Sequence, residues 1–139
     1  MCVVRQVEIK DVETVDGAYF KSPAWLDRKI DLVAITLLTL CGMVKTIGGH
    51  AFLLCRGLTS LTLGASVESI GGGAFYQCIG LASLIIPDSV KTIGGHAFCI
   101  CKGLTSLTLG ASVESIGNGA FSGCIGLASL VIPNSVKTI

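Results

Sequence analysis

The chain has 139 residues, of which 51% are hydrophobic and only 14% are charged, and its formal net charge is +1 at pH 7. This length allows one domain, and the apolar content excludes a disordered tail. A charge so close to zero, without clustered Lys and Arg, gives no electrostatic footprint for nucleic-acid binding.

The N-terminal segment, residues 1–11, alternates charged and apolar side chains, which is typical of an edge strand. No long apolar run follows Met1, so the sequence shows no secretory signal peptide. If Met1 is the natural start, we therefore expect the protein to lie inside the cell.

Residues 12–43 are interpreted as a degenerate copy, with an insertion around residues 21–29, of a unit that is repeated further along the chain. Val12–Val15 and Leu38–Leu40 match the corresponding parts of the later units. Because solenoids commonly need an atypical terminal unit, we expect residues 1–43 to form an N-terminal cap.

The same region contains a run of apolar residues and threonines from Leu32 to Val44. A membrane-spanning helix needs about 20 apolar residues, and this run has only 13. We expect a buried strand of the cap here and no membrane insertion.

The rest of the chain, residues 44–139, repeats one 23-residue unit in tandem without insertion or deletion. Its four complete copies are Val44–Ser66, Val67–Ser89, Val90–Ser112 and Val113–Ser135, and a fifth starts at Val136 and stops at Ile139. If the first valine is counted as position 1, eight positions are apolar in every copy. In the first unit they are Val44, Ile47, Ala51, Phe52, Cys55, Leu58, Leu61 and Leu63. One unit cannot enclose these side chains, whereas stacked units can, which predicts a solenoid.

The array also has a longer period of two units. Units one and three are identical at 20 of 23 positions and units two and four at 18, whereas units one and two share only 12. This pattern indicates that a pair of units was duplicated.

The period-two spacing of Leu61 and Leu63 predicts a short strand whose leucines point inward. The equivalent strands of units two and four are predicted at Leu84–Ile86 and Leu130–Ile132, where a proline follows and can end the ladder. Strands of successive units would pair in parallel.

The Ala-Phe-x-x-Cys segments, for example Gly73–Cys78 and Gly119–Cys124, have a spacing that fits about one helical or 3₁₀ turn. The predicted fold class is therefore α/β, a solenoid with a parallel sheet of short strands and short helical or 3₁₀ turns.

The pattern Ile-Gly-x-x-Ala-Phe-x-x-Cys-x-x-Leu-x-x-Leu-x-Ile-Pro occurs at Ile70–Pro87 and Ile116–Pro133. It resembles the BspA-like class of leucine-rich repeats over about two-thirds of the chain, although units one and three have Gly-Ala in place of Pro-x after the strand. The resemblance implies a leucine-rich-repeat solenoid and a family of cell-surface adhesins and protein-binding proteins. It brings no catalytic residues.

The last predicted strand segment, Leu127–Ile132, would be an open edge with unpaired backbone groups. No polar cap follows it. Either the array belongs to a longer protein, or another chain covers this edge by end-to-end association.

The cysteines at position 12 form a ladder of one thiol per unit, at Cys55, Cys78, Cys101 and Cys124. Disulfides or a metal are conceivable, but cysteine is a common small core residue, and we predict free buried thiols.

His50 and His96 lie two units apart, or about 10 Å by strand spacing, which is too far to share one metal ion. We interpret them as corner residues, and we predict no metal or other cofactor.

Position 2 carries alternating charges in successive units, at Lys45, Glu68, Lys91, Glu114 and Lys137. Opposite charges on neighbouring strands stabilise by about 0.2–1 kcal/mol per pair. A slip by one unit would place like charges together, so we interpret this charge ladder as a device that fixes register.

The outward face of the strands is the candidate partner-binding surface, because solenoids present extended faces to partners. Its residues are Ser60, Thr62, Ser83, Ile85, Ser106, Thr108, Ser129 and Val131. They are small and lack the aromatic and arginine anchors that dominate affinity, so binding there is expected to be weak.

We predict a non-catalytic scaffold for protein–protein interactions, with a protein as its partner. Two alternatives stay open: a cell-surface adhesin in which the repeats form a stalk, and a regulatory arm of an enzyme whose catalytic domain lies outside this chain.

Overall fold

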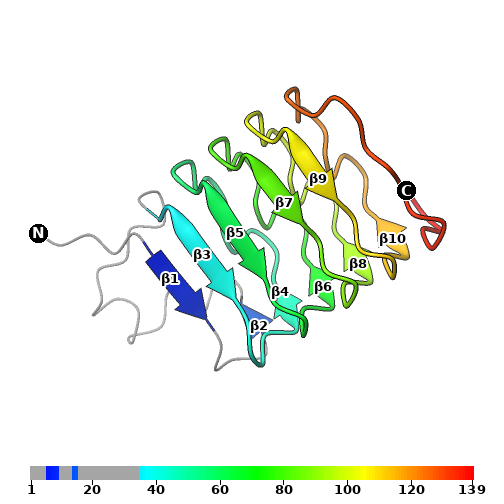
Figure 1. Ribbon diagram of the computed structural model, residues 1–139, viewed down its shortest axis with the longest axis horizontal. Helices are drawn as coiled ribbons and strands as arrows, with labels where there is room; N and C mark the ends of the chain where they lie inside the picture. Colours follow the sequence, from blue (N-terminus) through cyan, green and yellow to red (C-terminus); the bar gives the residue numbers. More distant parts are fainter. Residues whose placement is uncertain (1–5, 10–13, 16–34) are drawn as a thin grey trace, which may run out of the picture.

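The computed structural model describes residues 6–9, 14–15 and 35–139, and these residues form ten short parallel strands. The strands belong to three sheets that run along the stack of units (Figure 1). The first sheet has the order β1-β3-β5 and contains Gln6–Ile9, Leu37–Leu40 and Ser60–Leu63. The second has the order β10-β8-β6-β4-β2 and contains Ser115–Ile116, Thr92–Ile93, Ser69–Ile70, Thr46–Ile47 and Thr14–Val15. The third pairs β7, Ser83–Ile85, with β9, Ser106–Thr108.

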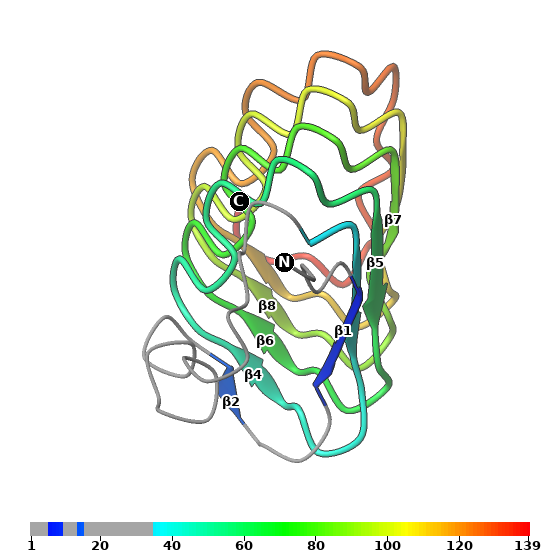
Figure 2. The ribbon, with the colours of Figure 1, turned by 90° about the vertical axis from the view of Figure 1, so that its left-hand side faces the viewer.

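Viewed along the stack, successive units superpose as turns of one coil (Figure 2). The short strands β2, β4, β6 and β8 lie on one side of this coil, and β1, β5 and β7 lie on another. The parallel pairing is in register by one unit, so that Leu61 of β5 lies beside Leu38 of β3 and Ile70 of β6 beside Ile47 of β4. The predicted solenoid with parallel strands is confirmed.

The helical part of the prediction was wrong, because the described residues contain no helix. In Gly73–Cys78, the amides of Tyr76 and Cys78 close local turns on Gly73 and Phe75, but those of Phe75 and Gln77 donate to the next unit. Every second N–H group thus bonds outside the unit, and a helix would require all of them inside it. The segment is a chain of turns, and the fold is a β-solenoid.

The core consists of the eight apolar positions stacked directly above one another. Phe52, Phe75 and Phe98 are completely buried, and each ring stacks on the next with 5.2 Å between centroids and interplanar angles of 11° and 5°. Phe121 continues the stack at 5.6 Å but is only half-buried, because one neighbouring unit covers it. Full burial of such a side chain stabilises by about 1.5–3 kcal/mol. Each unit therefore depends on its neighbours for the burial of its core.

The described parts of the N-terminal region follow the register of the repeats. β2 pairs with β4 so that Val15 lies beside Ile47, and the predicted edge strand is present as β1, which pairs with β3. Leu38 and Leu40 of the apolar run are buried in β3, and none of the described residues forms a helix that is long and apolar enough to cross a membrane. The insertion predicted around residues 21–29 lies outside the described residues, so the cap of residues 1–43 stays a prediction.

One side of the stack is interrupted where unit one meets unit two. Strand pairing joins β3 to β5 and β7 to β9, but in the described part of the chain no ladder joins β5 to β7. Leu61 and Leu63 of β5 are each 8% exposed at this interruption, whereas their equivalents Leu84 and Ile86 in unit two are covered. We call the β5–β7 interface the seam. The second sheet continues past it without a break.

A proline supplies a physical reason for the seam. At position 21, Gly64 of unit one donates its N–H to the carbonyl of Leu40 in the preceding unit. Unit two has Pro87 there, which has no N–H to donate toward unit one. Glycine is also required at this position of unit one, because a Cβ on Gly64 would lie 2.8 Å from the Leu40 oxygen and from the Cys41 Cα.

The strand predicted at Leu130–Ile132 is another correction, because the structure contains no strand there. Unit four begins with the same kind of interface as the seam, since Pro133 occupies position 21. By analogy with β7 and β9, the strand segment of unit four would pair with the strand of a following unit. This chain contains only Val136–Ile139 of such a unit. Its segment therefore has no ladder partner among the described strands.

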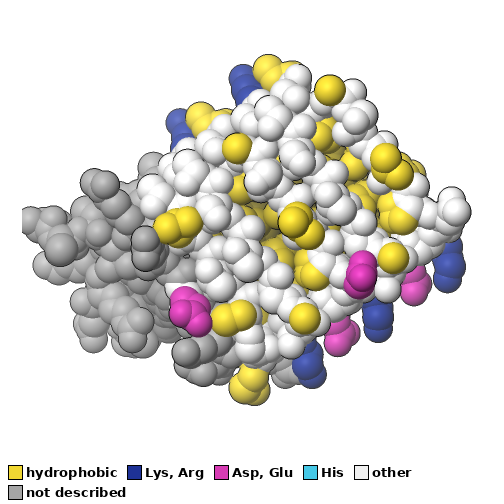
Figure 3. All heavy atoms as spheres, viewed as in Figure 1, with side chains coloured by type: hydrophobic (Ala, Val, Ile, Leu, Met, Phe, Trp, Pro, Cys, Tyr) yellow, Lys and Arg dark blue, Asp and Glu magenta, His cyan; other side chains and the backbone are white. Residues whose placement is uncertain are grey.

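The position-2 charges lie along one edge of the stack and alternate in sign (Figure 3). From Glu68 onward, each residue donates its backbone N–H to the carbonyl of the residue before it in the ladder, for example Lys91 to Glu68 and Glu114 to Lys91 at 2.8 Å. Lys137 also forms an exposed ion pair with Glu114 at 3.6 Å. The backbone thus holds charges of alternating sign in adjacent units, as the interpretation of this ladder requires.

The seam predicts uneven hydrogen exchange at equivalent positions. The amides of Thr105 and Ser106 donate to the carbonyl of Ala82, but those of Ala82 and Ser83, the same positions one unit earlier, have no such bond across the seam. After correction for intrinsic rates, amide exchange measured by NMR should be at least about tenfold faster at Ala82 and Ser83, which corresponds to roughly 1.4 kcal/mol of local opening.

The substitution Pro87→Gly tests the cause of the seam, because it restores an N–H donor at position 21. Protection of Ala82 and Ser83 should then increase toward that of Thr105 and Ser106. Equal protection of the two pairs in the unmodified protein would contradict the seam, and unchanged protection in the variant would show that the proline is not its cause.

The charge ladder predicts a site-specific effect of charge reversal. Lys91→Glu places three carboxylates in adjacent units and should lower the melting temperature at low salt by roughly 1–5 °C, with a smaller effect at high salt. Lys102→Glu makes the same change in the same unit, away from the ladder, and is the control. Calorimetry that shows no difference between the two variants at low salt would refute the ladder.

Candidate functional site

The predicted strand face points outward as expected. Ser60 is half-buried and the other seven predicted residues are exposed, and Figure 3 shows this face with hydrophobic side chains among the small polar ones. Ile85 is 70% exposed and Val131 is 82% exposed. These two branched side chains occupy position 19 of units two and four, where units one and three have threonine.

The strand face also contains a hollow of about 290 Å³ at the seam. Its walls come from β5 on one side and from β7 and Pro87 on the other. The missing ladder thus creates a concave feature between Thr62 and Ile85 on a face that would otherwise be flat. The sequence analysis named residues on both sides of this hollow but did not predict the hollow itself.

The cysteine ladder belongs to the core. Cys55, Cys78, Cys101 and Cys124 are free and buried. Each of the last three donates its S–H to the phenylalanine carbonyl of the preceding unit, as Cys101 does to Phe75 at 3.3 Å. A hydrogen bond with Cys55 and burial raise the pKa of Cys78, and a hydrogen bond with Cys124 and burial raise the pKa of Cys101. The prediction of free buried thiols is confirmed for these residues.

The two histidines are exposed and occupy corners in the left-handed region, with φ of 56° at His50 and 57° at His96. Each ring lies over the glycine at position 7 of the next unit. A Cβ on Gly73 would be 2.7 Å from Cδ2 of His50, and one on Gly119 would be 2.5 Å from Nδ1 of His96. The histidines therefore pack on glycine. Within the described residues, no group of three His, Cys, Asp or Glu side chains could hold a metal ion.

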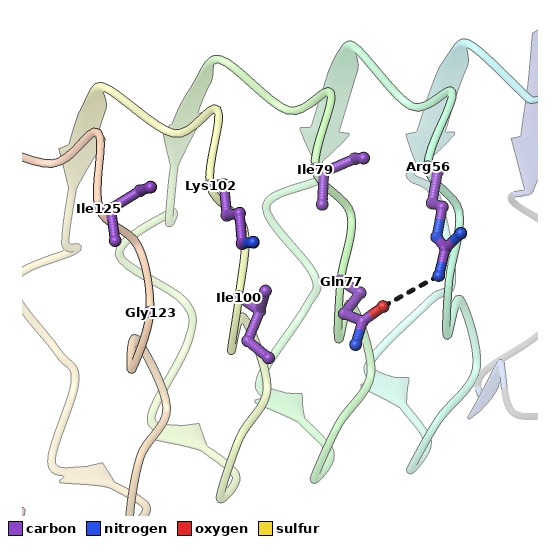
Figure 4. A pocket seen from close by; sticks show the side chains of 7 residues that line it. All are labelled: Arg56, Gln77, Ile79, Ile100, Lys102, Gly123 and Ile125. Carbon is purple, nitrogen blue, oxygen red and sulfur yellow. Dashed lines mark hydrogen bonds between the residues drawn. The ribbon is translucent and has the colours of Figure 1, made fainter.

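A second concave surface lies on the turn side of the stack, and the sequence analysis did not predict it. It is a groove of about 400 Å³ that crosses all four units (Figure 4). Its walls are position 13, with Arg56, Ile79, Lys102 and Ile125, and position 11, with Gln77, Ile100 and Gly123. We call it the turn groove.

The turn groove combines positive charge with exposed aliphatic surface. Arg56 and Lys102 are exposed, and the Arg56 Nη2 donates to Oε1 of Gln77 at 3.2 Å. Ile79 is 42% exposed and Ile125 is 79% exposed. None of the described carboxylates lines the groove. The arrangement offers charge-assisted hydrogen bonds and apolar contact, but no nucleophile or base.

The backbone at position 11 directs side chains into this groove at some cost. Leu54, Gln77 and Ile100 have φ of 62°, 59° and 60°. The equivalent residue of unit four, Gly123, also has a positive φ, which glycine adopts without strain. Left-handed backbone costs an L-residue roughly 1–2 kcal/mol, and isoleucine is among the residues least suited to it. The signal available in the sequence was position 13 itself, which alternates between a cation and isoleucine with the two-unit period.

The stacked parallel strands and the repeated leucine positions define a leucine-rich-repeat β-solenoid. The chain belongs to the BspA type leucine rich repeat family, whose sequence model matches residues 31–139 in six copies. The resemblance seen in the sequence is thereby confirmed.

Solved structures with the same fold come from several bacteria. The T. pallidum leucine-rich repeat protein (TpLRR) is 31% identical with a TM-score of 0.71, and the match covers 94% of this chain and 53% of that one. A leucine-rich cell surface protein from Faecalibacterium prausnitzii A2-165 is 24% identical with a TM-score of 0.73, covering 89% of this chain and 31% of that one. A leucine-rich repeat protein from Bacteroides ovatus is 20% identical with a TM-score of 0.63, covering 98% and 42%. The present chain thus spans about half the length of the T. pallidum protein and less of the others.

A search of curated proteins finds no match to this chain. The family and the solved relatives are leucine-rich repeat proteins, a class that commonly binds other proteins.

The buried thiols predict a definite order of chemical labelling. Thiolate is the reactive form, and the raised pKa of Cys78 and Cys101 together with their burial should make both react slowly in the folded protein. Among the described cysteines, Cys41 is half-buried and should react before Cys78 and Cys101, and Cys124, at 9% exposure, should react before Cys101. Peptide mapping by mass spectrometry after iodoacetamide pulses at pH 7.5 would measure this order. Rapid labelling of Cys78 or Cys101 would show that these thiols are not part of the core.

Proposed function

We propose that this chain is a non-catalytic scaffold that binds other proteins through outward faces of its repeat stack. The observation that supports this most directly is the regular exposure of branched aliphatic side chains. Units two and four each present one on the strand face, Ile85 and Val131, and one on the turn side, Ile79 and Ile125. Exposed apolar side chains that recur on one surface are typical of interaction sites.

The core gives these exposed residues no structural role. All eight apolar positions of a unit are filled by other side chains that stack on their equivalents. Units one and three already have polar residues at the exposed positions, with arginine or lysine at position 13 and threonine at position 19. Serine at either position of units two and four should therefore not lower stability. Contact with a partner is therefore the reason we propose for the aliphatic residues. The strand-face residues predicted from the sequence belong to this proposal.

The proposal assigns no catalytic residues, cofactor or metal to the chain, in keeping with a family of leucine-rich repeat proteins. It includes end-to-end association through residues 127–132, whose backbone has no ladder partner among the described strands. A role as an adhesin stalk or as the regulatory arm of an enzyme would use the same surfaces, within a longer protein.

Selection of binding peptides from a random phage-displayed library tests the scaffold function. The immobilised protein should enrich clones above a blank matrix, since a face built to bind segments of other proteins also binds short peptides. Two matched double variants then locate the binding. Ile85→Ser with Val131→Ser removes the aliphatic groups of the strand face, and Ile79→Ser with Ile125→Ser removes those of the turn groove.

Enriched clones should lose most of their binding to one of these variants and keep it to the other. Circular dichroism should show that both variants melt within a few degrees of the unmodified protein. If no clones are enriched, or if every clone binds both variants as well as the original, the exposed aliphatic residues do not form binding sites.

A further inference from the structure

We propose that the turn groove binds an acidic peptide segment of a partner protein, extended along the axis of the stack. This inference rests on the proposed scaffold function and names the surface and the chemistry of its occupant. It is carried by the charge of the groove, by its shape and by the spacing of its two cations.

The charge of the groove differs from that of a second column of equivalent residues with the same spacing. Along position 2, Lys45 and Lys91 are separated by Glu68, and the ladder neutralises itself. Along position 13, Arg56 and Lys102 are also two units apart, but Ile79 stands between them. The two columns thus have the same spacing of cations and a different residue in the intervening unit.

The described carboxylates all lie elsewhere. Glu8, Glu68, Asp88 and Glu114 are absent from the walls of the groove. The positive charge of Arg56 and Lys102 is therefore left for a ligand to complement, and carboxylates are the natural partners of guanidinium and ammonium groups.

The shape of the groove favours an extended segment. Figure 4 shows its side chains arranged along the stack from Arg56 to Ile125, and the lining residues come from all four units. Successive units are about 4.8 Å apart, so this length is about 14 Å, equivalent to four or five residues of extended chain. The exposed faces of Ile79 and Ile125 can cover apolar groups of the ligand.

The spacing of the cations matches one regular backbone conformation. Arg56 and Lys102 are two units apart, or about 9.6 Å at the spacing of parallel strands. In a polyproline II helix, residues i and i+3 lie on the same face about 9.3 Å apart. A segment with two carboxylates three residues apart would therefore place one at each cation.

A membrane surface and a nucleic acid fit these observations less well. Two cations provide little attraction to an anionic lipid surface, where each contributes about 1 kcal/mol. The aliphatic groups lie in a concave wall, whereas insertion into a membrane needs a protruding apolar face. A single-stranded nucleic acid would need stacking platforms, and no aromatic side chain from the described part of the chain lines the groove.

The experiment uses a capped hexapeptide, Glu-Pro-Leu-Glu-Pro-Leu, whose prolines favour the polyproline II conformation. It is titrated into the isotopically labelled chain and followed by NMR. The control peptide has glutamine in place of both glutamates. We expect amide shifts to concentrate at Gln77, Ile79, Ile100, Lys102 and Gly123, with clearly weaker binding of the glutamine peptide.

Two double variants with the same change of net charge locate the interaction. Arg56→Gln with Lys102→Gln removes the cations of the groove and should weaken binding about three- to tenfold. Lys45→Gln with Lys91→Gln removes two cations at the same spacing from the position-2 ladder and should leave binding unchanged within about twofold. The melting temperatures of both variants verify folding.

Several results would overturn the inference. These are equal binding of the glutamate and glutamine peptides, equal affinity of the two double variants, and shifts confined to the strand face. Binding to phosphatidylglycerol vesicles through Arg56 and Lys102, without binding of the peptide, would assign the groove to a membrane surface. Failure of the scaffold function is a separate outcome. It would be shown by a phage selection that enriches no clone, or only clones whose binding depends on neither face.

Discussion

The stability of this protein depends on contact between equivalent residues of neighbouring units. Phe75 is buried between Phe52 and Phe98, and the other apolar positions of neighbouring units pack together in the same core. Backbone hydrogen bonds join the units at the short strands and at the turns, for example from Phe52 to Ala74 and from Phe75 to Ala97. These two sets of hydrogen bonds are made at every interface from unit one to unit four. The stack therefore stays in register even at the seam, where the hydrogen bonds between the longer strands are absent.

The interfaces between units are of two kinds, and the pair of units is the real structural repeat. Where unit two meets unit three, β7 and β9 form a ladder, and Gly110 approaches Pro87 so closely that no Cβ would fit. Where unit one meets unit two, the ladder is missing, and His50 lies over Gly73 instead. Position 7, which alternates between histidine and glycine, and position 21, which alternates between glycine and proline, both follow this two-unit period.

Much of this architecture could be predicted from the sequence, because it follows from identical units that stack. The burial of the phenylalanines, the free thiols at position 12 and the alternation of charge at position 2 all require only that equivalent residues lie in adjacent units. The helical turns could not be excluded in this way. Ala-Phe-x-x-Cys has a helical spacing of inward residues, and only the destination of alternate N–H groups, such as that of Phe75, decides against a helix.

The seam and the turn groove were missed for a different reason. Pro87 was correctly interpreted as a residue that can end a ladder along the strand, but its missing N–H also affects the pairing between units. The turn groove depends on the left-handed backbone of Gln77 and Ile100, which are residues that seldom adopt it. Sequence patterns reveal a backbone conformation only where the residue type favours it. At Gln77 and Ile100 the residue type does not favour the left-handed conformation, and contacts with the neighbouring units impose it.

Repetition also determines where such a protein can acquire a binding function. A change at any of the eight stacked positions affects the burial of both neighbouring units, so these positions are constrained. Positions 13 and 19 face solvent in every described unit and tolerate arginine, lysine, isoleucine, threonine or valine. The two-unit period gives each of them a regular alternation, with like residues about 9.6 Å apart. A ligand that extends along the stack would meet the same chemical group at each such step, so its affinity would increase with the number of units it contacts rather than with any single anchor residue.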